Sequence, residues 1–180
     1  MAWQLDKAHT QIAFAVKHMM VSTVRGQFKN FSGTVELDEQ HPERSRVEVM
    51  IDPTSIDTGD ERRDGHLRTA DFFEVEKHPE IRFVSTHVER ASDDEYRVTG
   101  ALSMRGVTRP VTLDVTLEGQ SRDMQGQRRA GFSLHGAINR KDYGLTWNVA
   151  LEQGGVLVGD KVQLVIDAEV FEPAQVSASV

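Results

Sequence analysis

The sequence predicts an all-β domain of about eight antiparallel strands, and three observations support that prediction. Apolar side chains recur at every second position along several segments, which is the period of strands that bury one face. Stretches rich in Gly, Asp, Ser and Pro separate these segments and predict turns. No regular alternation of strands with long helices occurs, which argues against a parallel sheet.

The alternation is strict in some segments and weaker in others. In "VTLDVTLE", for example, Val111, Leu113 and Val115 fall on one face. The strict segments are 12–18, 31–38, 45–52, 111–118 and 161–170, and the weaker ones are 80–89, 95–104 and 129–138. Strands in this order, joined mostly by short turns, leave two architectures: a sandwich or a closed meander barrel.

The choice between these architectures decides the function. Nothing in the chain specifically supports the sandwich, since no Cys and Trp core pair occurs. A barrel of about eight strands has an interior that side chains fill or that holds one slim ligand. The inward-facing sets mix Val, Ile and Leu with Ala13, Ala15, Ala168 and several glycines, so the pattern permits a cavity.

Two segments predict helical turns. In "GDERRDGHLRTADFF", residues 59–73, acidic residues come early and β-branched residues are rare, so a short helix is predicted from about Glu61 to Ala70. We expect it to cross a barrel opening and to turn Leu67, Phe72 and Phe73 inward as an apolar lid. A second helical turn is predicted within "MMVSTVRG", residues 19–26.

The composition excludes several classes of function. The net charge of -7 argues against nucleic-acid binding, which needs clustered Lys and Arg. With no cysteine, the chain has neither disulfides nor thiolate chemistry. The 180 residues suffice for one domain, which we expect to span residues 1–172, followed by a frayed tail at 173–180.

The first twenty residues do not have the pattern of a signal peptide. Their longest apolar run, "IAFAV", is shorter than the roughly 7–15 residues of an apolar signal region. No stretch approaches the roughly 20 apolar residues of a spanning helix. A cytoplasmic location is therefore expected.

Four stretches, in order, resemble those of one known family. They are "LDKAHTQIAFAVKHMMVSTVRGQFKNFSG", "IDTGDERRDGHLRTADFFEVEKHPEIRFVST", "VTGALSMRGVTRPVTL" and "GFSLHGAINRKDYGL". The second stretch is the most recognisable, through Arg63, Asp64 and His66 and then the pair Phe72 and Phe73. From Trp3 to Phe171 the chain is similar to the YceI-like family.

This resemblance implies a lipocalin-like, eight-stranded antiparallel up-and-down β-barrel with one or two short helices closing an end. It implies a binding protein rather than an enzyme: a carrier or store that holds a polyprenyl compound or an isoprenoid quinone in its hydrophobic pore. A fatty acid or fatty amide is the alternative cargo. Many members are periplasmic, whereas this chain starts at the first strand, which favours a cytoplasmic branch.

The resemblance also implies a homodimer and no cofactor other than the bound polyisoprenoid or other long-chain lipid. Nucleic acid is not an expected partner, and without a transmembrane segment the expected membrane contact is transient. The expected ligand-binding residues are mostly apolar side chains on inward strand faces and in the lid, together with His18 at a strand end and Trp147 after a turn. They are Phe14, Val16, His18, Phe31, Val35, Val49, Ile51, Leu67, Phe72, Phe73, Phe83, Leu102, Leu113, Phe132, Leu134, Ile138 and Trp147.

Three basic side chains, Arg63, His66 and Arg140, are candidates for binding a lipid headgroup, because they supply hydrogen-bond donors. The alternative for Arg63, and equally for Arg140 with Asp142, is an ion pair with an acid that fixes a loop. A metal-dependent enzyme using the histidines is a less favoured function, since His9 and His18 are nine residues apart and match no metal motif. We expect no catalytic residue and no metal site.

Overall fold

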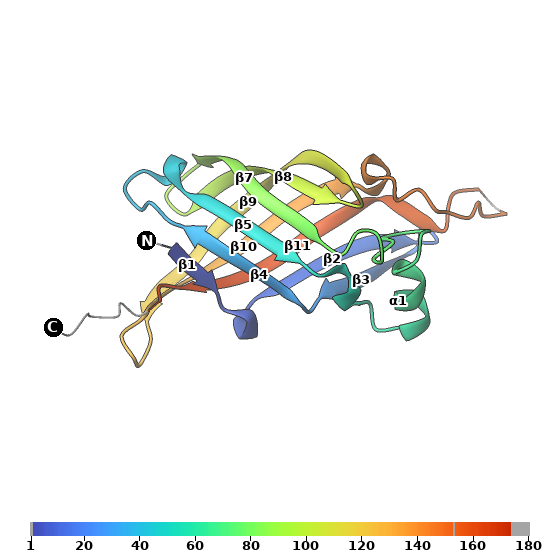
Figure 1. The fold of residues 1–180 in the computed structure, drawn as a ribbon. Coiled ribbons are helices and arrows are strands. Elements are labelled where there is room, and N and C mark those ends of the chain that lie inside the picture. The colour runs from blue at the N-terminus through green and yellow to red at the C-terminus, as the bar shows by residue number, and fades with distance from the viewer. Residues whose placement is uncertain (1, 153, 174–180) are drawn as a thin grey trace.

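The computed structural model describes residues 2–152 and 154–173, and its strands form one closed sheet (Figure 1). The rest of the predicted tail, residues 174–180, lies outside the described residues. The strands are β1 (Ala2–Leu5), β2 (Gln11–His18), β3 (Ser22–Phe28), β4 (Phe31–Glu36), β5 (Arg46–Ile51), β6 (Ile56–Asp57), β7 (Ile81–Arg90), β8 (Glu95–Met104), β9 (Val107–Arg122), β10 (Arg128–Asn139) and β11 (Val158–Phe171). All pair antiparallel, and pairing of β1 with β11 closes the sheet.

Three of the barrel strands are interrupted. β1 and β2 pair with successive parts of β11, so together they form one barrel strand. On their other side, β1 pairs with β4 and β2 pairs with β3, so β3 and β4 together form the next barrel strand. By the same pairing, β5 continues into β6. The described segments therefore form eight barrel strands, each beside the next one in the chain. The predicted antiparallel up-and-down barrel is confirmed.

Short helices lie between the strands. Helix α1 (Glu61–Leu67) begins after Asp60, whose carboxylate accepts hydrogen bonds from the backbone N–H groups of Arg62 and Arg63. The predicted helix is thus confirmed, although it ends three residues before Ala70. The 3-10 helices are η1 (Lys7–His9), η2 (Pro42–Arg44), η3 (Pro53–Ser55) and η4 (Arg140–Tyr143).

The helical turn predicted within residues 19–26 is wrong, because this segment forms the β2–β3 turn and most of β3. Thr23 and Val24 are β-branched and pair with Lys17 and Val16 across the hairpin. Gly26 pairs with Phe14, and a Cβ at this position would collide with the Phe14 ring. The glycine therefore lets an inward aromatic side chain cross the neighbouring strand.

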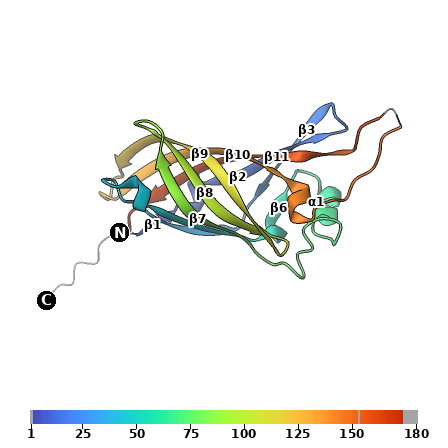
Figure 2. The same cartoon turned by 90° about the horizontal axis from the view of Figure 1, so that it is seen from above.

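The barrel has two dissimilar ends (Figure 2). The α1 end contains α1, the β2–β3 turn, the β8–β9 turn and the segment that follows η4. The N-terminal end contains the start of β1, the β4–β5 loop, the β7–β8 and β9–β10 turns and the end of β11. In the described residues no helix is long and apolar enough to cross a membrane.

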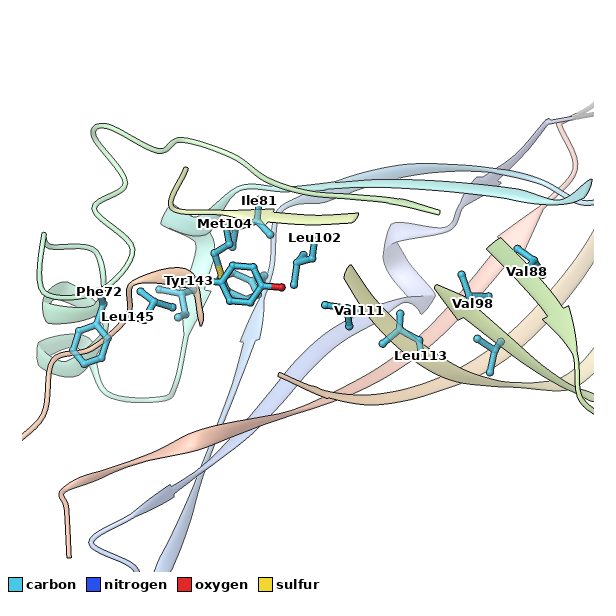
Figure 3. Packing of buried hydrophobic residues seen from close by; sticks show 13 residues of the cluster. Phe72, Ile81, Val88, Val98, Leu102, Met104, Val111, Leu113, Tyr143 and Leu145 are labelled. Atoms are coloured by element: carbon cyan, nitrogen blue, oxygen red, sulfur yellow. The ribbon is translucent and has the colours of Figure 1, made fainter. Parts of the chain in front are cut away.

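Inward side chains form the hydrophobic core. Figure 3 shows it extending from Phe72 and Leu145, beside α1, to Val88 and Val98 farther along the barrel. A smaller cluster of Trp3, Val35, Ala130 and Val170 lies apart from it. Since Trp3 is in β1, this second cluster belongs to the N-terminal end.

Candidate functional site

A cavity of about 580 Å³ occupies the barrel interior. Its lining is almost entirely apolar and comes from the inward faces of the strands. It reaches both ends, since Trp3 and Arg128 line it at the N-terminal end and Leu67 and Phe73 at the α1 end. The volume falls in the range of about 300–1,000 Å³ that holds one small ligand.

Most of the predicted ligand-binding residues line this cavity. They are Phe14, Val16, Val35, Val49, Ile51, Leu67, Phe72, Phe73, Phe83, Leu102, Leu113, Phe132, Leu134 and Ile138. Three others lie outside the lining. His18 ends β2 beside the turn, Phe31 is buried in the wall, and Trp147 packs behind α1. The strand period identifies a face but does not show where along the barrel the cavity ends.

Several lining residues were absent from the predicted set. Trp3 precedes the first predicted strand, and Phe28 lies just beyond the segment predicted as a helical turn. Val98 and Leu164 belong to predicted strands and have the same parity as their inward neighbours, so the alternation could have identified them.

Apolar side chains at the end of α1 and just after it line the α1 end of the cavity. Phe73 donates its backbone N–H to the carbonyl of Leu67 at 3.0 Å, which folds the chain back beneath α1. Its ring meets Phe28 edge-on with centroids 5.9 Å apart. Phe72 is buried, and its ring lies 5.4 Å from that of Trp147. These contacts hold the predicted lid residues against the barrel wall.

Arg105 ties the same segment to the rest of the barrel. Its guanidinium donates to the carbonyl of Ala70 at 2.8 Å and to the carbonyl of Gly144. It also lies 3.7 Å from the carboxylate of Glu74, where the backbone turns with a positive φ of 47°. One side chain from the β8–β9 turn thus holds both sides of the α1 end.

Arg140 lines the cavity at the α1 end, and its guanidinium is held by backbone carbonyls. Its side chain is 3% exposed, and it donates to the backbone carbonyls of Leu145, Trp147, Val158 and Gly159 at 2.6–3.3 Å. Burial lowers the pKa of Arg140, opposed by the nearby charge of Asp160. Its guanidinium is therefore a structural tie between η4 and β11.

The other two headgroup candidates lie outside the cavity lining. Arg63 donates to the hydroxyl and the carbonyl of Thr58 at 2.7 and 2.8 Å, so it fixes the loop before α1. His66 bonds Asp71 at 2.8 Å, and its ring lies 4.7 Å from that of Trp147. The three predicted candidates thus do not converge on one point of the cavity.

Polar side chains gather instead at the N-terminal end of the cavity, where the lining includes Asp38, Glu39, Ser45, Gln120 and Arg128. Asp38 accepts hydrogen bonds from the backbone N–H groups of Gln40 and His41, and Arg128 forms an ion pair with Glu39. Among the described residues, the carboxylates that line the cavity, Asp38 and Glu39, are therefore at this end.

Arg128 stands between the cavity and the surface. Its guanidinium carbon lies 5.2 Å from the centre of the Trp3 ring, and one guanidinium nitrogen lies 3.6 Å from the Glu172 carboxylate. The residues that line both the cavity and a hollow at the surface are Trp3, Leu37, Asp38, Glu39 and Arg128. These side chains therefore lie where the cavity and the hollow meet.

A separate polar cluster fastens the break between β1 and β2. Arg129 donates to the carboxylates of Asp6, Asp123 and Glu169 at 2.8–3.0 Å. Partial burial acts to raise the pKa of Asp6, but hydrogen bonds from His9 and Arg129 outweigh it and lower that pKa. Asp6, His9 and Glu169 have the spacing of metal ligands, yet the Arg129 guanidinium already forms ion pairs with both carboxylates.

Comparison with known proteins identifies the family. A YceI-like domain model matches residues 3–170. A UPF0312 protein of Pectobacterium atrosepticum is 45% identical over 146 residues, which are 80% of this chain and 76% of that protein. Protein YceI of Salmonella newport is 38% identical over 169 residues, 93% of this chain and 85% of that protein.

Two solved structures share the fold. Burkholderia cenocepacia BcnA superposes with a TM-score of 0.79 at 25% identity, over 92% of this chain and 98% of BcnA. A polyisoprenoid binding domain from Saccharophagus degradans superposes with a TM-score of 0.70 at 16% identity, over 95% and 98% of the two chains. The chain belongs to the YceI-like family.

Proposed function

We propose that this protein binds one long-chain isoprenoid-type lipid, a polyprenyl compound or an isoprenoid quinone, and acts as its carrier or store rather than as an enzyme. The observation that carries the proposal is the apolar cavity of about 580 Å³, which extends from the polar N-terminal end to the aromatic side chains beneath α1. The related fold of a polyisoprenoid binding domain from Saccharophagus degradans supports it.

Burial of only part of an isoprenoid tail is enough for tight binding. At about 0.8 kcal/mol per buried CH₂, one five-carbon isoprene unit contributes up to about 4 kcal/mol before ordering costs. Three buried units therefore supply about 12 kcal/mol, so a longer tail is free to bend or to protrude. Apolar contacts of this kind select weakly between tails, and selectivity would come from the headgroup.

The charges at the N-terminal end favour an uncharged headgroup. The outer hollow is lined by four acids, Glu36, Asp38, Glu39 and Glu172, against two arginines, Arg44 and Arg128. An excess of negative charge repels a carboxylate or a pyrophosphate, whereas a quinone carbonyl can accept a hydrogen bond from Arg128. We therefore propose that the headgroup lies at this end and the tail at the α1 end.

A fatty amide is the second candidate, because its uncharged headgroup meets the same condition. A fatty acid is less favoured, since its carboxylate would lie among the acids of the hollow. Extraction and identification of the lipid that copurifies with the protein distinguishes these cargoes.

A cavity-filling variant tests the proposal. Leu164→Trp adds bulk to the lining of β11, and Val165→Trp adds the same bulk on the outward neighbour, which is 37% exposed. In native mass spectrometry of protein purified without detergent, we expect a lipid adduct on the wild type and on Val165→Trp but not on Leu164→Trp. A folded wild type that is empty, and that takes up neither a ubiquinone nor a fatty amide, would refute the proposal.

A further inference from the structure

The β2–β3 hairpin ends in exposed apolar side chains. Met19, Met20 and Val21 form its turn and are 46%, 63% and 83% exposed. The turn lies at the α1 end of the barrel, on the same side as the segment that follows η4 (Figure 2). Single exposed apolar residues are common, but three in succession at a projecting turn are not.

The backbone of this turn is unfavourable for the residues that it contains. Met19 and Met20 have φ values of 53° and 65°, and Val21 donates its N–H to the His18 carbonyl at 3.2 Å. A tight turn with two positive φ values strongly favours Asn-Gly, because methionine is strained in this region. Stability alone would therefore not place two methionines here, and backbone strain of this kind is typical of functional positions.

A second segment holds the turn in place. Met19 donates its backbone N–H to the Leu157 carbonyl at 2.8 Å, and Ala150 pairs with Val156 in a small hairpin. Gly155 approaches the Met20 side chain so closely that a Cβ would lie 3.1 Å from its Cγ. Val149 of this segment is 46% exposed. Met19, Met20, Val21 and Val149 thus form one surface, here termed the apolar tip.

The hairpin is also a basic region of an acidic chain. Residues 7–35 contain no Asp or Glu, although the net charge of the chain is -7. Lys17 and Arg25 are exposed on the outward face of the hairpin. Of the nearby acids, Glu152 is exposed in the second segment, and Asp160 lies 3.4 Å from the Lys141 ammonium. The charge beside the apolar tip is therefore positive.

We propose that the apolar tip docks on a membrane surface that contains anionic lipids. The methionines and valines enter the headgroup layer, and Lys17 and Arg25 lie over the lipid phosphates. Binding of this type depends jointly on buried apolar area and on attraction to negative lipids. The α1 end of the cavity then faces the bilayer, so the apolar tail of a cargo lies next to the hydrocarbon.

This inference goes beyond cargo binding and holds for whichever lipid occupies the cavity. Its test uses the double variant Met19→Asn/Met20→Gly, which installs the residues that the turn prefers. The matched control is Met124→Asn, because Met124 is 97% exposed in the β9–β10 turn at the opposite end. Co-sedimentation measures binding to vesicles of equal parts phosphatidylcholine and phosphatidylglycerol, without added cargo.

We expect the double variant to bind these vesicles about tenfold more weakly than the wild type and Met124→Asn. Its urea midpoint should stay unchanged or rise, because the turn strain is removed. Vesicle binding by the double variant at the wild-type level, or no binding by the wild type, would overturn the proposal. Neither outcome depends on cargo, so failure of the membrane proposal can be distinguished from failure of the lipid-binding proposal.

A second pair of measurements tests the choice of partner. Lys17→Glu/Arg25→Glu should weaken binding to the anionic vesicles, and the wild type should bind pure phosphatidylcholine vesicles less well. Equal binding of the wild type to both vesicles would refute the role of charge. If the wild type is a dimer without vesicles and Met19→Asn/Met20→Gly makes it a monomer, the tip joins two copies and the membrane proposal fails.

Discussion

The two ends of the barrel use arginine in opposite ways. At the α1 end, Arg140 is buried and donates to four backbone carbonyls, and Arg105 bonds the carbonyls of Ala70 and Gly144. At the N-terminal end, Arg128 meets side-chain carboxylates and the face of Trp3. An arginine held by carbonyls fixes the backbone, whereas we propose that Arg128, which lines the cavity, exchanges its carboxylate partners for a ligand. Partners, rather than residue type, therefore decide the role.

The largest expected effect comes from replacing the two arginines in parallel. Arg140→Ala leaves buried carbonyls without donors and should lower the free energy of unfolding by about 3–5 kcal/mol. Arg128→Ala removes a partly exposed ion pair and should cost less than about 1 kcal/mol. Urea unfolding followed by circular dichroism measures both. If Arg140→Ala left stability unchanged but weakened lipid binding, Arg140 would contact the headgroup after all.

A smaller effect is expected from opening the α1 end. Phe73→Ala removes a partly buried ring that contacts Phe28 and should cost about 2–4 kcal/mol. Phe83→Ala is the control, since Phe83 lines the side wall of the cavity rather than its end. Both variants should be less stable, but only Phe73→Ala should release a preloaded lipid faster. Equal release rates would make Phe73 part of the wall and not of a lid.

The smallest expected effect is a pH dependence at the β1–β2 break. The hydrogen bond to Asp6 raises the pKa of His9 above its ordinary 6.5, so this bond stabilises the fold fully below pH 6.5. Its contribution is lost as the pH rises through the raised pKa. The lowered pKa of Asp6 acts in the opposite direction: it contributes stability above pH 3.8, and this contribution is lost only as the pH falls below that value. His9→Gln should therefore remove a decline in stability on the alkaline side of pH 6.5.

That decline is measured from urea midpoints across neutral pH in the wild type and in His9→Gln. His87→Gln provides the control, because His87 is exposed and its imidazole lies 4.0 Å from Glu89. Identical pH profiles for the wild type and His9→Gln would show that the Asp6 contact contributes nothing in solution.

The barrel was predictable from the sequence because strand period is a local property. Val111, Leu113 and Val115 alternate whatever their neighbours are, and all three line the cavity. The β2–β3 turn was not predictable, because its methionines adopt φ values that their residue type disfavours. Arg140 was singled out from the sequence as a headgroup candidate or a loop-fixing residue, but its four carbonyl partners were not predictable, since they come together only in the folded chain.

The two tryptophans of the chain test the central claim, which is that the cavity holds an isoprenoid-type lipid with its headgroup at the N-terminal end. Trp3 lines the cavity at that end, and Trp147 packs behind α1. A quinone headgroup quenches the fluorescence of a nearby tryptophan, so Trp3→Phe and Trp147→Phe report on opposite ends. Titration with a ubiquinone should quench the fluorescence of Trp147→Phe, which keeps Trp3. It should leave the fluorescence of Trp3→Phe, which keeps Trp147, nearly unchanged. Quenching of Trp3→Phe alone, or of neither variant, would contradict the account.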